Sequence, residues 1–401
     1  MKQSRNYDDA SLSLHAELKG KLEVHSRIKI KDEETMALVY TPGVAAPCKA
    51  IQKDQALSYE LTRRGNTIAV ITDGTAVLGL GDIGPEASMP VMEGKCVLFK
   101  EFGDVEAIPL CIKSKDVDEL VNTIALLSGS FGGINLEDIS SPRCFELEQK
   151  LQERCDIPVF HDDQHGTAIV VCAALINACA LVHKDMTKIR VVQNGPGAAG
   201  TAIIFMLQLL GVTDIIAVDE YGILVEGRTQ PVTGYKQTLA QSSNPRGITG
   251  GLKDALQGAD VFIGTSVAGC LSKEMIKHMN RDAIIFACAN PIPEIYPQDA
   301  FDAGASIVCT GRSDFPNQVN NVLVFPGLFR GALDAKATKI TKNMKKAAIV
   351  ALADVVKGEL RPDYILPKAF DPRIKKAVSQ AVKEAALQDG VQRVSSDDFN
   401  A

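Results

Sequence analysis

Short apolar segments alternate with helical patterns through the first 160 residues of the chain. Three segments are rich in β-branched and apolar residues, as expected of buried strands in a parallel sheet. They span residues 67–72, 107–112 and 157–160, and apolar residues at helical spacing fill 117–128 and 143–153. This order predicts a small α/β domain.

A second alternation begins near residue 189. Strand-like segments are expected at 189–194, 212–218, 259–266, 283–289 and 306–309, an apolar helix at 201–210, and mostly helices at 328–386. We expect an α/β fold, with a smaller N-terminal substrate domain followed by a Rossmann-like, doubly wound domain that carries C-terminal helices. The predicted bounds are 1–160 and 161–386, followed by a polar tail at 387–401.

The first strand-to-helix turn of the second domain predicts a dinucleotide site. Its G-x-G-x-x-G pattern consists of Gly195, Pro196, Gly197, Ala198, Ala199 and Gly200. Asp219 directly follows the next predicted strand, 19 residues after Gly200. The glycines let the backbone approach a pyrophosphate at the positive end of a helix. Asp219 favours NAD, since a carboxylate bonds a ribose 2′-hydroxyl and repels a 2′-phosphate. Glu220 adds to that repulsion, while Arg228 leaves NADP open.

An earlier G-x-G-x-x-G, at residues 79–84, is discounted as a dinucleotide loop. Pro85 follows its third glycine and Pro90 interrupts the next stretch, so we expect no long helix to open there. The segment is expected to form a tight backbone loop near a ligand instead.

Composition narrows the class of protein. The length of 401 residues favours two domains, and a net charge of −6 gives no support for nucleic acid or an anionic membrane as partner. The longest apolar run, 168–182, is interrupted by Asn177 and is too short for a membrane span, so it is expected to be a buried helix. The ten cysteines form no C-x-x-C pair and the N-terminus has no apolar signal core, which favours a reduced, cytoplasmic setting.

Two acidic pairs are candidate metal ligands. Glu137 and Asp138 follow one strand-like segment, and Asp162 and Asp163 follow another. Mg²⁺ and Mn²⁺ select carboxylate oxygens, so we expect a divalent cation there. His161 and His165 have the spacing of a zinc pair on a helix, but Gly166 follows at once and no third soft ligand is close, so zinc is the weaker interpretation.

Several single residues are candidates for chemistry, each with a plainer alternative. Lys95 is either a surface lysine or a partly buried amine with a lowered pKa, able to act as a general base. Tyr40 stands in a turn defined by Pro42 and Gly43, where it could simply pack against the loop. Thr265, Ser266 and Asn290 follow predicted strands, where they either line a ligand or cap backbone.

Taken together, these motifs resemble the malic enzyme family in its short prokaryotic-type form. The resemblance rests on residues 40–45, 72–74, 79–84, 92–95, 136–139, 161–167, 289–291 and 320–321, in the order that the family has. It implies oxidation of malate with NAD or NADP and a divalent cation such as Mg²⁺ or Mn²⁺, followed by decarboxylation to pyruvate.

The resemblance also implies individual roles. Tyr40 would be the general acid and Lys95 the general base, with Asp162 supporting Lys95. The metal ligands would be Glu137, Asp138 and Asp163, and the substrate contacts would be Lys95, Asn290 and Asn321. One departure is Ala76, which stands where long members of the family have an arginine that grips a malate carboxylate. Arg63, Arg64 or a group from a second subunit could replace it.

Three alternatives remain open from the sequence. The same site could decarboxylate oxaloacetate, or convert malate to lactate with no net reduction of cofactor. A dinucleotide-binding regulator without catalysis is the third, although it would need neither acidic pair. A homodimer or larger homo-oligomer is expected, since dimers are the commonest assemblies.

Overall fold

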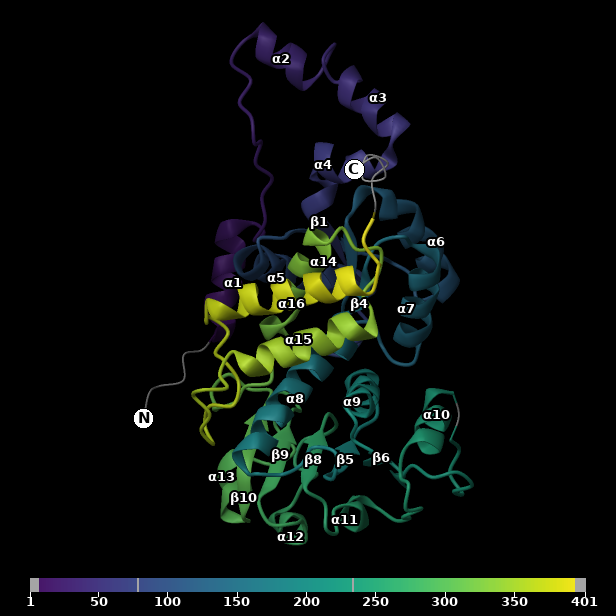
Figure 1. The fold of residues 1–401 in the computed structure, drawn as a ribbon, viewed down its shortest axis with the longest axis vertical. Coiled ribbons are helices and arrows are strands. Elements are labelled where there is room, and N and C mark those ends of the chain that lie inside the picture. The colour runs from purple at the N-terminus through teal and green to yellow at the C-terminus, as the bar shows by residue number, and fades with distance from the viewer. Residues whose placement is uncertain (1–6, 78, 233, 394–401) are drawn as a thin grey trace.

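The computed structural model describes residues 7–77, 79–232 and 234–393. It contains two β-sheets, one parallel and one mostly parallel, joined by a long central helix (Figure 1). The first sheet has four parallel strands in the order β2-β1-β3-β4. They are β1 (Thr67–Thr72), β2 (Glu106–Cys111), β3 (Gly133–Leu136) and β4 (Val159–His161). All three strands expected from the apolar pattern of the first domain are therefore present.

Helices cover both faces of this sheet. On one face lie α6 (Val117–Leu127) and α7 (Arg143–Arg154), and on the other lies α5 (Pro85–Gly103). β1 shows why: Ala69 and Ile71 pack with the first pair, whereas Ile68 and Val70 face the opposite core. A strand with both faces buried must be apolar at every position, as β1 nearly is.

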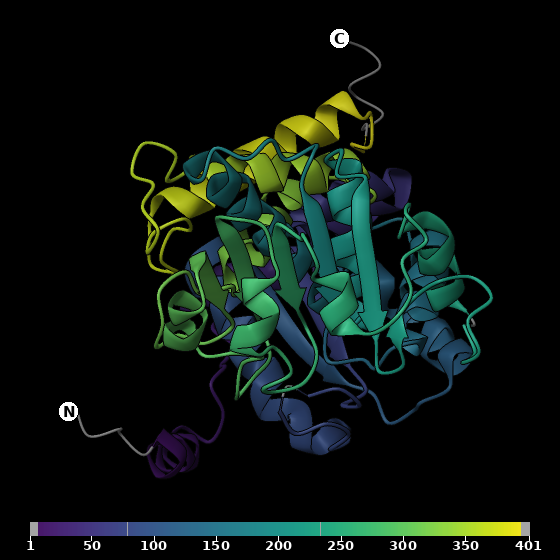
Figure 2. The ribbon, with the colours of Figure 1, turned by 90° about the horizontal axis from the view of Figure 1, so that it is seen from below.

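The second sheet has the order β10-β9-β8-β5-β6-β7, in which only the short β7 is antiparallel. Its strands are β5 (Arg190–Asn194), β6 (Asp214–Asp219), β7 (Gly222–Ile223), β8 (Val261–Gly264), β9 (Ala283–Ala287) and β10 (Ala305–Thr310). The strand order reverses between β5 and β8, which is where doubly wound sheets bind dinucleotides. Figure 2 shows this sheet from below, flanked by helices. The predicted α/β, Rossmann-like fold is confirmed.

The helices of the second half form two groups. Near the sheet lie α8 (Asp162–Leu181), α9 (Ala198–Leu209), α10 (Tyr235–Ser242), α11 (Leu252–Ala255), α12 (Lys273–Lys277) and α13 (Pro297–Asp302). The C-terminal group is α14 (Phe325–Asp334), α15 (Lys342–Asp354) and α16 (Arg373–Gln388). α14 packs on α5 and on the first sheet, since Phe325 and Phe329 contact Phe99 of α5 with ring centroids 4.6 and 5.4 Å apart, and Phe329 contacts Phe160 of β4 at 5.9 Å. The C-terminal helices thus contact both the first and the second half of the chain. The domain bounds expected from the sequence, 1–160 and 161–386, remain a prediction.

Short 3-10 turns complete the chain, namely η1 (Gln55–Leu57), η2 (Arg63–Asn66), η3 (Ser128–Ser130) and η4 (Asn321–Leu323). The last part of the predicted polar tail, residues 394–401, lies outside the described residues.

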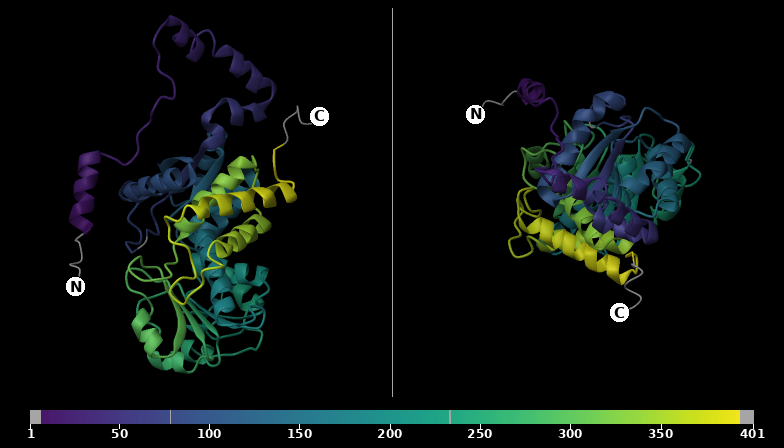
Figure 3. Two further views of the ribbon diagram at one scale, coloured as in Figure 1. Left: turned by 60° about the vertical axis from the view of Figure 1, so that its left-hand side comes forward. Right: turned by 90° about the horizontal axis from the view of Figure 1, so that it is seen from above.

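An N-terminal arm, residues 7–62, extends from this body (Figure 3). It contains α1 (Tyr7–Leu18), α2 (Glu33–Val39), α3 (Ala45–Lys53) and α4 (Ser58–Leu61), and none of these helices has a buried residue. Many of its large apolar side chains are exposed, among them Leu12, Val24, Ile30 and Leu38. An exposed apolar surface of this kind is typical of a subunit interface.

The expectation that no long helix opens after residues 79–84 is wrong. α5 begins at Pro85 itself and runs for 19 residues through Pro90. Proline suits the first turn of a helix, where its missing N–H has no partner to lose. Pro90 removes one further bond, but burial of Met92, Cys96 and Phe99 on the core side of α5 outweighs this loss. The preceding loop still belongs to the first sheet and not to the dinucleotide-binding one.

The apolar run around residues 168–182 forms α8, a core helix. By length and composition α8 could cross a membrane, yet 72% of its apolar window is buried inside the protein. Asn177, which interrupts the run, is buried and donates to Ala353 O and Ile365 O, both at 2.9 Å. Its amide therefore satisfies two carbonyl groups at the end of α15 and in the loop that follows.

Replacing Asn177 with leucine should leave these two buried carbonyls without donors. Each unsatisfied group costs about 1–3 kcal/mol, so the free energy of unfolding should fall by about 2–6 kcal/mol. Urea denaturation measures this loss. The same substitution at the exposed Asn122 of α6 is the control, with an expected change below about 0.5 kcal/mol. Equal effects at the two positions would contradict the assigned role.

Candidate active site

Both acidic pairs predicted from the sequence lie at the carboxyl edge of the first sheet. Glu137 and Asp138 follow β3, and Asp162 and Asp163 open α8 directly after β4. β3 and β4 are adjacent parallel strands, so their ends meet at one edge. Glu137, Asp138 and Asp163 each offer an oxygen, and these atoms lie within 4.8 Å of one another. The Asp138 N–H donates to Asp163 Oδ2 at 2.7 Å, which joins the two loops.

Lys95 projects from α5 into this carboxylate cluster. Its Nζ donates to Glu137 Oε1 at 2.9 Å and to Asp162 Oδ2, and it lies 4.0 Å from the centroid of the Phe325 ring. Lys95 is buried and so is not the surface lysine of the plainer interpretation. Burial lowers its pKa, but the Asp162 and Glu137 carboxylates outweigh burial and raise it. A general base was expected to have a lowered pKa, but these protein groups alone raise the pKa of Lys95.

If all four carboxyl groups around this one ammonium were ionised, they would carry more negative charge than Lys95 can balance. Burial and the neighbouring Asp163 and Glu137 raise the pKa of Asp138 to about 9. Asp138 Oδ2 is buried and has no hydrogen-bond partner in the described part of the chain. Three convergent carboxylates with a free oxygen fit a hard divalent cation. Mg²⁺ or Mn²⁺ would be held by Glu137, Asp138 and Asp163.

The two histidines do not form a zinc site. His165 Nε2 bonds Glu148 Oε2 at 2.9 Å, while His161 Nε2 lies 3.7 Å from Asp163 Oδ2. Among the described residues, the group of side chains that converges for a metal contains carboxylates alone. Both histidine residues instead bond Glu148 of α7, His165 through its ring and His161 through its backbone N–H, and these bonds fix the start of α8.

Glu148 is a supporting residue that the sequence analysis missed. It is buried in α7 and accepts from the His161 backbone N–H at 2.9 Å as well as from His165. Burial raises its pKa, but His165 outweighs burial and brings it to about 2. A charged residue on the apolar stripe of α7, beside Leu147 and Leu151, was the available signal.

The predicted dinucleotide loop lies where the strand order of the second sheet reverses. β5 ends at Asn194, residues 195–197 form the turn, and α9 begins at Ala198. Gly195 has φ +88°, and a side chain there would come within 2.6 Å of Thr265 O. A Cβ at Gly200 would lie 2.1 Å from Gly195 O. Both positions therefore need glycine. The lack of a side chain also lets the backbone approach a pyrophosphate closely.

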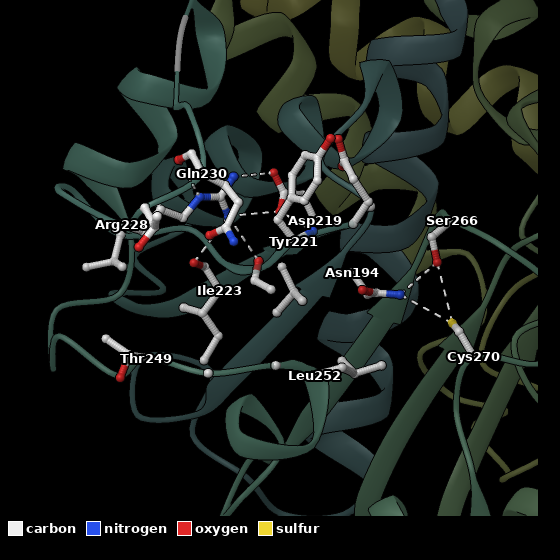
Figure 4. A pocket seen from close by; sticks show the side chains of 18 of the residues that line it. Asn194, Asp219, Tyr221, Ile223, Arg228, Gln230, Thr249, Leu252, Ser266 and Cys270 are labelled. Atoms are coloured by element: carbon white, nitrogen blue, oxygen red, sulfur yellow. Dashed lines mark hydrogen bonds and ion pairs between the residues drawn. The ribbon is translucent and has the colours of Figure 1, made fainter.

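A pocket of about 970 Å³ adjoins this loop, lined by the turn at Gly195 and by residues 218–230 (Figure 4). Two of the predicted loop residues hold it together. Thr265 Oγ1 donates to Gly195 O at 2.8 Å, and Ser266 Oγ accepts from Asn194 Nδ2 at 2.7 Å. Both side chains therefore already bond protein groups beside the pocket.

Asp219 lies in the pocket, but its carboxylate is fully engaged. Arg228 donates to both of its oxygens at 2.9 and 2.7 Å, and Lys236 donates to Oδ2 at 2.9 Å. Burial raises the pKa of Asp219, but these hydrogen bonds outweigh burial and lower it. Lys236 also bonds Glu220 at 3.1 Å. Two cations balance the two acids, so the repulsion of a 2′-phosphate predicted from Asp219 and Glu220 is weakened.

The structure brings Asn321 close to Asp162 across Gly166. A Cβ at Gly166 would lie 1.9 Å from Asp162 Oδ1 and 3.0 Å from Asn321 Cβ. Asn290 lies in the loop that follows β9, where its amide fills the space left by Gly311. Its place at the carboxyl end of a strand of the second sheet is the one expected of a ligand-lining residue.

Three predicted residues are not part of this cluster within one chain. Tyr40 ends α2 on the N-terminal arm, where 71% of its surface is exposed. Arg63 and Arg64 precede β1, at the opposite end of the strand from the carboxylates, and Arg64 is bonded to Phe131 O and Ser58 Oγ. β1 spans about 20 Å, so neither arginine reaches the cluster of its own subunit.

The fold and the site define a class of protein, a two-domain NAD(P)-dependent oxidoreductase. The family description "Malic enzyme, N-terminal domain" matches residues 19–152, and "Malic enzyme, NAD binding domain" matches residues 164–387. The chain belongs to the malic enzyme family, whose members are decarboxylating oxidoreductases, as the resemblance predicted.

Relatives of known name agree with this assignment. The "Bifunctional malic/malolactic enzyme" of Bacillus subtilis is 54% identical, over 97% of this chain and 95% of that protein. The "NAD-dependent malic enzyme" of Geobacillus stearothermophilus is 51% identical, over 97% of this chain and 80% of that protein. The solved structure of the NAD-dependent malic enzyme from Thermotoga maritima has a TM-score of 0.91 at 48% identity, and covers 93% of this chain and 98% of that one.

Mn²⁺ should stabilise the folded protein through the three carboxylates. A ligand at about 100 times its dissociation constant adds about 2.7 kcal/mol to the free energy of unfolding. Asp138→Asn should remove most of this gain, measured by thermal denaturation with Mn²⁺ or with EDTA. Asp138 has φ +54°, a backbone conformation that asparagine also tolerates.

Asp104→Asn is the matched control, because Asp104 has the same φ of +54° but lies exposed at the end of α5. It should keep the full stabilisation by Mn²⁺. An equal response to Mn²⁺ in Asp138→Asn and in the wild type would rule out the proposed site.

Proposed function

We propose that this chain catalyses the divalent-metal-dependent oxidative decarboxylation of malate to pyruvate and CO₂, with NAD or NADP as oxidant. One observation carries the proposal: Lys95 lies buried between Glu137 and Asp162, beside three carboxylates that converge for a cation. Such a site places a potential base next to a bound hydroxy acid. The dinucleotide pocket supplies the oxidant from the second sheet.

The order of steps follows from the chemistry of malate. Direct loss of CO₂ would leave an unstabilised carbanion, whereas oxidation at C2 first creates a carbonyl that accepts the electron pair. When bound, the cation would polarise the C2 oxygen and offset the charge that raises the pKa of Lys95, and the nicotinamide would accept the hydride. Lys95 must first lose its own proton to solvent; as a neutral amine it then takes the hydroxyl proton, and Asp162 holds the ammonium that results. Asn290 and Asn321 orient the substrate.

Tyr40 is proposed as the acid that protonates C3, acting in the site of a partner subunit. Its arm has no buried residue and exposes an apolar surface, while contacts such as Lys21 with Glu93 and Arg27 with Glu106 join it to the body by polar groups. A two-fold dimer in which arms are exchanged would bury this surface and carry each Tyr40 to the other subunit. Ala76 lacks the arginine that binds a malate carboxylate in long members of the family. We propose that a side chain from the partner's arm binds this carboxylate instead.

A second function is favoured by one comparison. The Bacillus subtilis relative carries the name of a malolactic as well as a malic enzyme. Retention of the reduced cofactor would let the same site return hydride to pyruvate and release lactate. Decarboxylation of added oxaloacetate would need the metal-binding carboxylates with their cation, Lys95 and Tyr40, but no dinucleotide. All ten cysteines are free, in keeping with the cytoplasmic location that we propose.

With malate and Mn²⁺, the wild type should form reduced cofactor, seen at about 340 nm, and pyruvate in equal amounts. Lys95→Ala should lower this rate by about 10²- to 10⁴-fold, the usual loss for a positioned base. Lactate without reduced cofactor would assign the malolactic reaction instead. Near-full turnover by Lys95→Ala would refute the role of Lys95.

Subunit mixing tests the exchange of arms. Tyr40→Phe and Lys95→Ala should each be nearly inactive alone. If Tyr40 acts across subunits, a heterodimer keeps one intact site, so mixed and refolded chains should recover about a quarter of wild-type activity. Absence of recovery, with heterodimers demonstrated by differential tags, would place Tyr40 in the site of its own chain.

A further inference from the structure

Glu294 has a buried carboxylate that none of the roles described above uses. It lies in the loop that follows β9 and is fully buried. Its Oε1 accepts from the Ser266 backbone N–H at 3.0 Å, and its Oε2 accepts from the Ala289 N–H at 3.0 Å. Within the described part of the chain, no lysine, arginine or histidine forms an ion pair with it.

Burial of a carboxylate without a neighbouring cation costs free energy, so the buried position of Glu294 requires an explanation. Burial raises the pKa of Glu294, although the two backbone N–H groups oppose this shift. A carboxylate can accept at both oxygens, whereas a glutamine has one accepting oxygen and an NH₂ group that would face the second donor. The fork of two N–H groups is therefore specific for glutamate, since the aspartate side chain is shorter.

The two donor N–H groups belong to the loops after β8 and β9, at the carboxyl edge of the second sheet where ligands are expected to bind. Ser266 follows β8 beside Thr265, which bonds the dinucleotide turn at Gly195. Ala289 directly precedes Asn290, the proposed substrate contact. Two backbone bonds strengthen the connection, from Leu271 N to Glu294 O and from Gly269 N to Pro293 O, both at 3.1 Å.

We propose that Glu294 is a positioning residue, whose carboxylate fixes the loop after β8 relative to the loop after β9 and so sets the distance between nicotinamide and malate. The proposal deepens the malate-oxidising function and rests on it. Hydride transfer depends steeply on this distance, whereas binding of either ligand alone does not.

Neighbouring residues accommodate this arrangement. A Cβ at Gly264, the last residue of β8, would lie 2.5 Å from the carboxyl carbon of Glu294. The absence of a side chain there leaves the carboxylate its place. Arg312 donates to Pro291 O at 2.5 Å and holds the other end of the same loop.

The test uses Glu294→Gln and Gly264→Ala in the full-length protein. Gly264→Ala displaces the carboxylate while keeping its charge, so the two variants should behave alike. Each should lower kcat for malate oxidation about 10- to 100-fold, with the KM for malate changed by less than about 3-fold. The primary isotope effect on kcat with C2-deuterated malate should rise, because hydride transfer becomes slower relative to product release.

Two further readouts separate positioning from loss of structure. Binding of NADH, followed by its fluorescence, should stay within about 3-fold of the wild type in both variants. Glu274→Gln, an exposed acid paired with Lys277, is the matched control and should leave all values unchanged. Failure of the wild type to oxidise malate at all would instead refute the proposed function.

The positioning role is overturned by either of two results. One is a kcat close to wild type in both variants. The other is a parallel loss of kcat and NADH binding with an unchanged isotope effect, which would show general unfolding of the loops.

Discussion

The buried charge cluster around Lys95 is the constraint on which the rest of the structure depends. One ammonium group lies among four carboxyl groups, of which three are buried and the Asp163 side chain is partly exposed. Such a cluster would be strongly destabilising if its members were free to move apart. The fold fixes them by placing β3 next to β4, by burying α5 behind the sheet, and by opening α8 with Asp162 and Asp163. The helix N-terminus carries a partial positive charge that favours these two acids.

The second sheet and the C-terminal helices complete this arrangement. Phe325 of α14 lies against the Lys95 ammonium and also against Phe99, so one helix connects the cluster to the core of the first domain. η4, which precedes α14, places Asn321 beside the start of α8. The chain therefore returns from the second sheet to the carboxylate edge of the first sheet, and in the proposed mechanism the loops after β8 and β9 hold the two ligands together.

The sequence predicted those parts of the structure that depend on local pattern. Strands such as β1 are apolar at nearly every position, and the turn at Gly195 lies between a strand and a helix, so both could be assigned from neighbours in the chain. The two acidic pairs were visible because each follows a strand-like segment. Adjacent parallel strands then bring such pairs together without further information.

The remaining features depend on contacts between residues far apart in the chain. The proline-containing α5 forms because its apolar face is buried, which a propensity argument does not include. The raised pKa of Lys95 and the balanced charge of Asp219 come from partners identified only in three dimensions. Glu294 resembles any loop glutamate in the sequence, because both of its donors are backbone groups. The proposed place of Tyr40 in an active site depends on a second chain.

The proposed role of the carboxylates around Lys95 is to hold a divalent cation. Anomalous diffraction at the manganese edge, from crystals grown with Mn²⁺, would test this role directly. We expect one strong peak bounded by oxygens of Glu137, Asp138 and Asp163, with Lys95 beside it but not coordinating. A fully occupied Mn²⁺ elsewhere, or no peak between these carboxylates at saturating Mn²⁺, would contradict it.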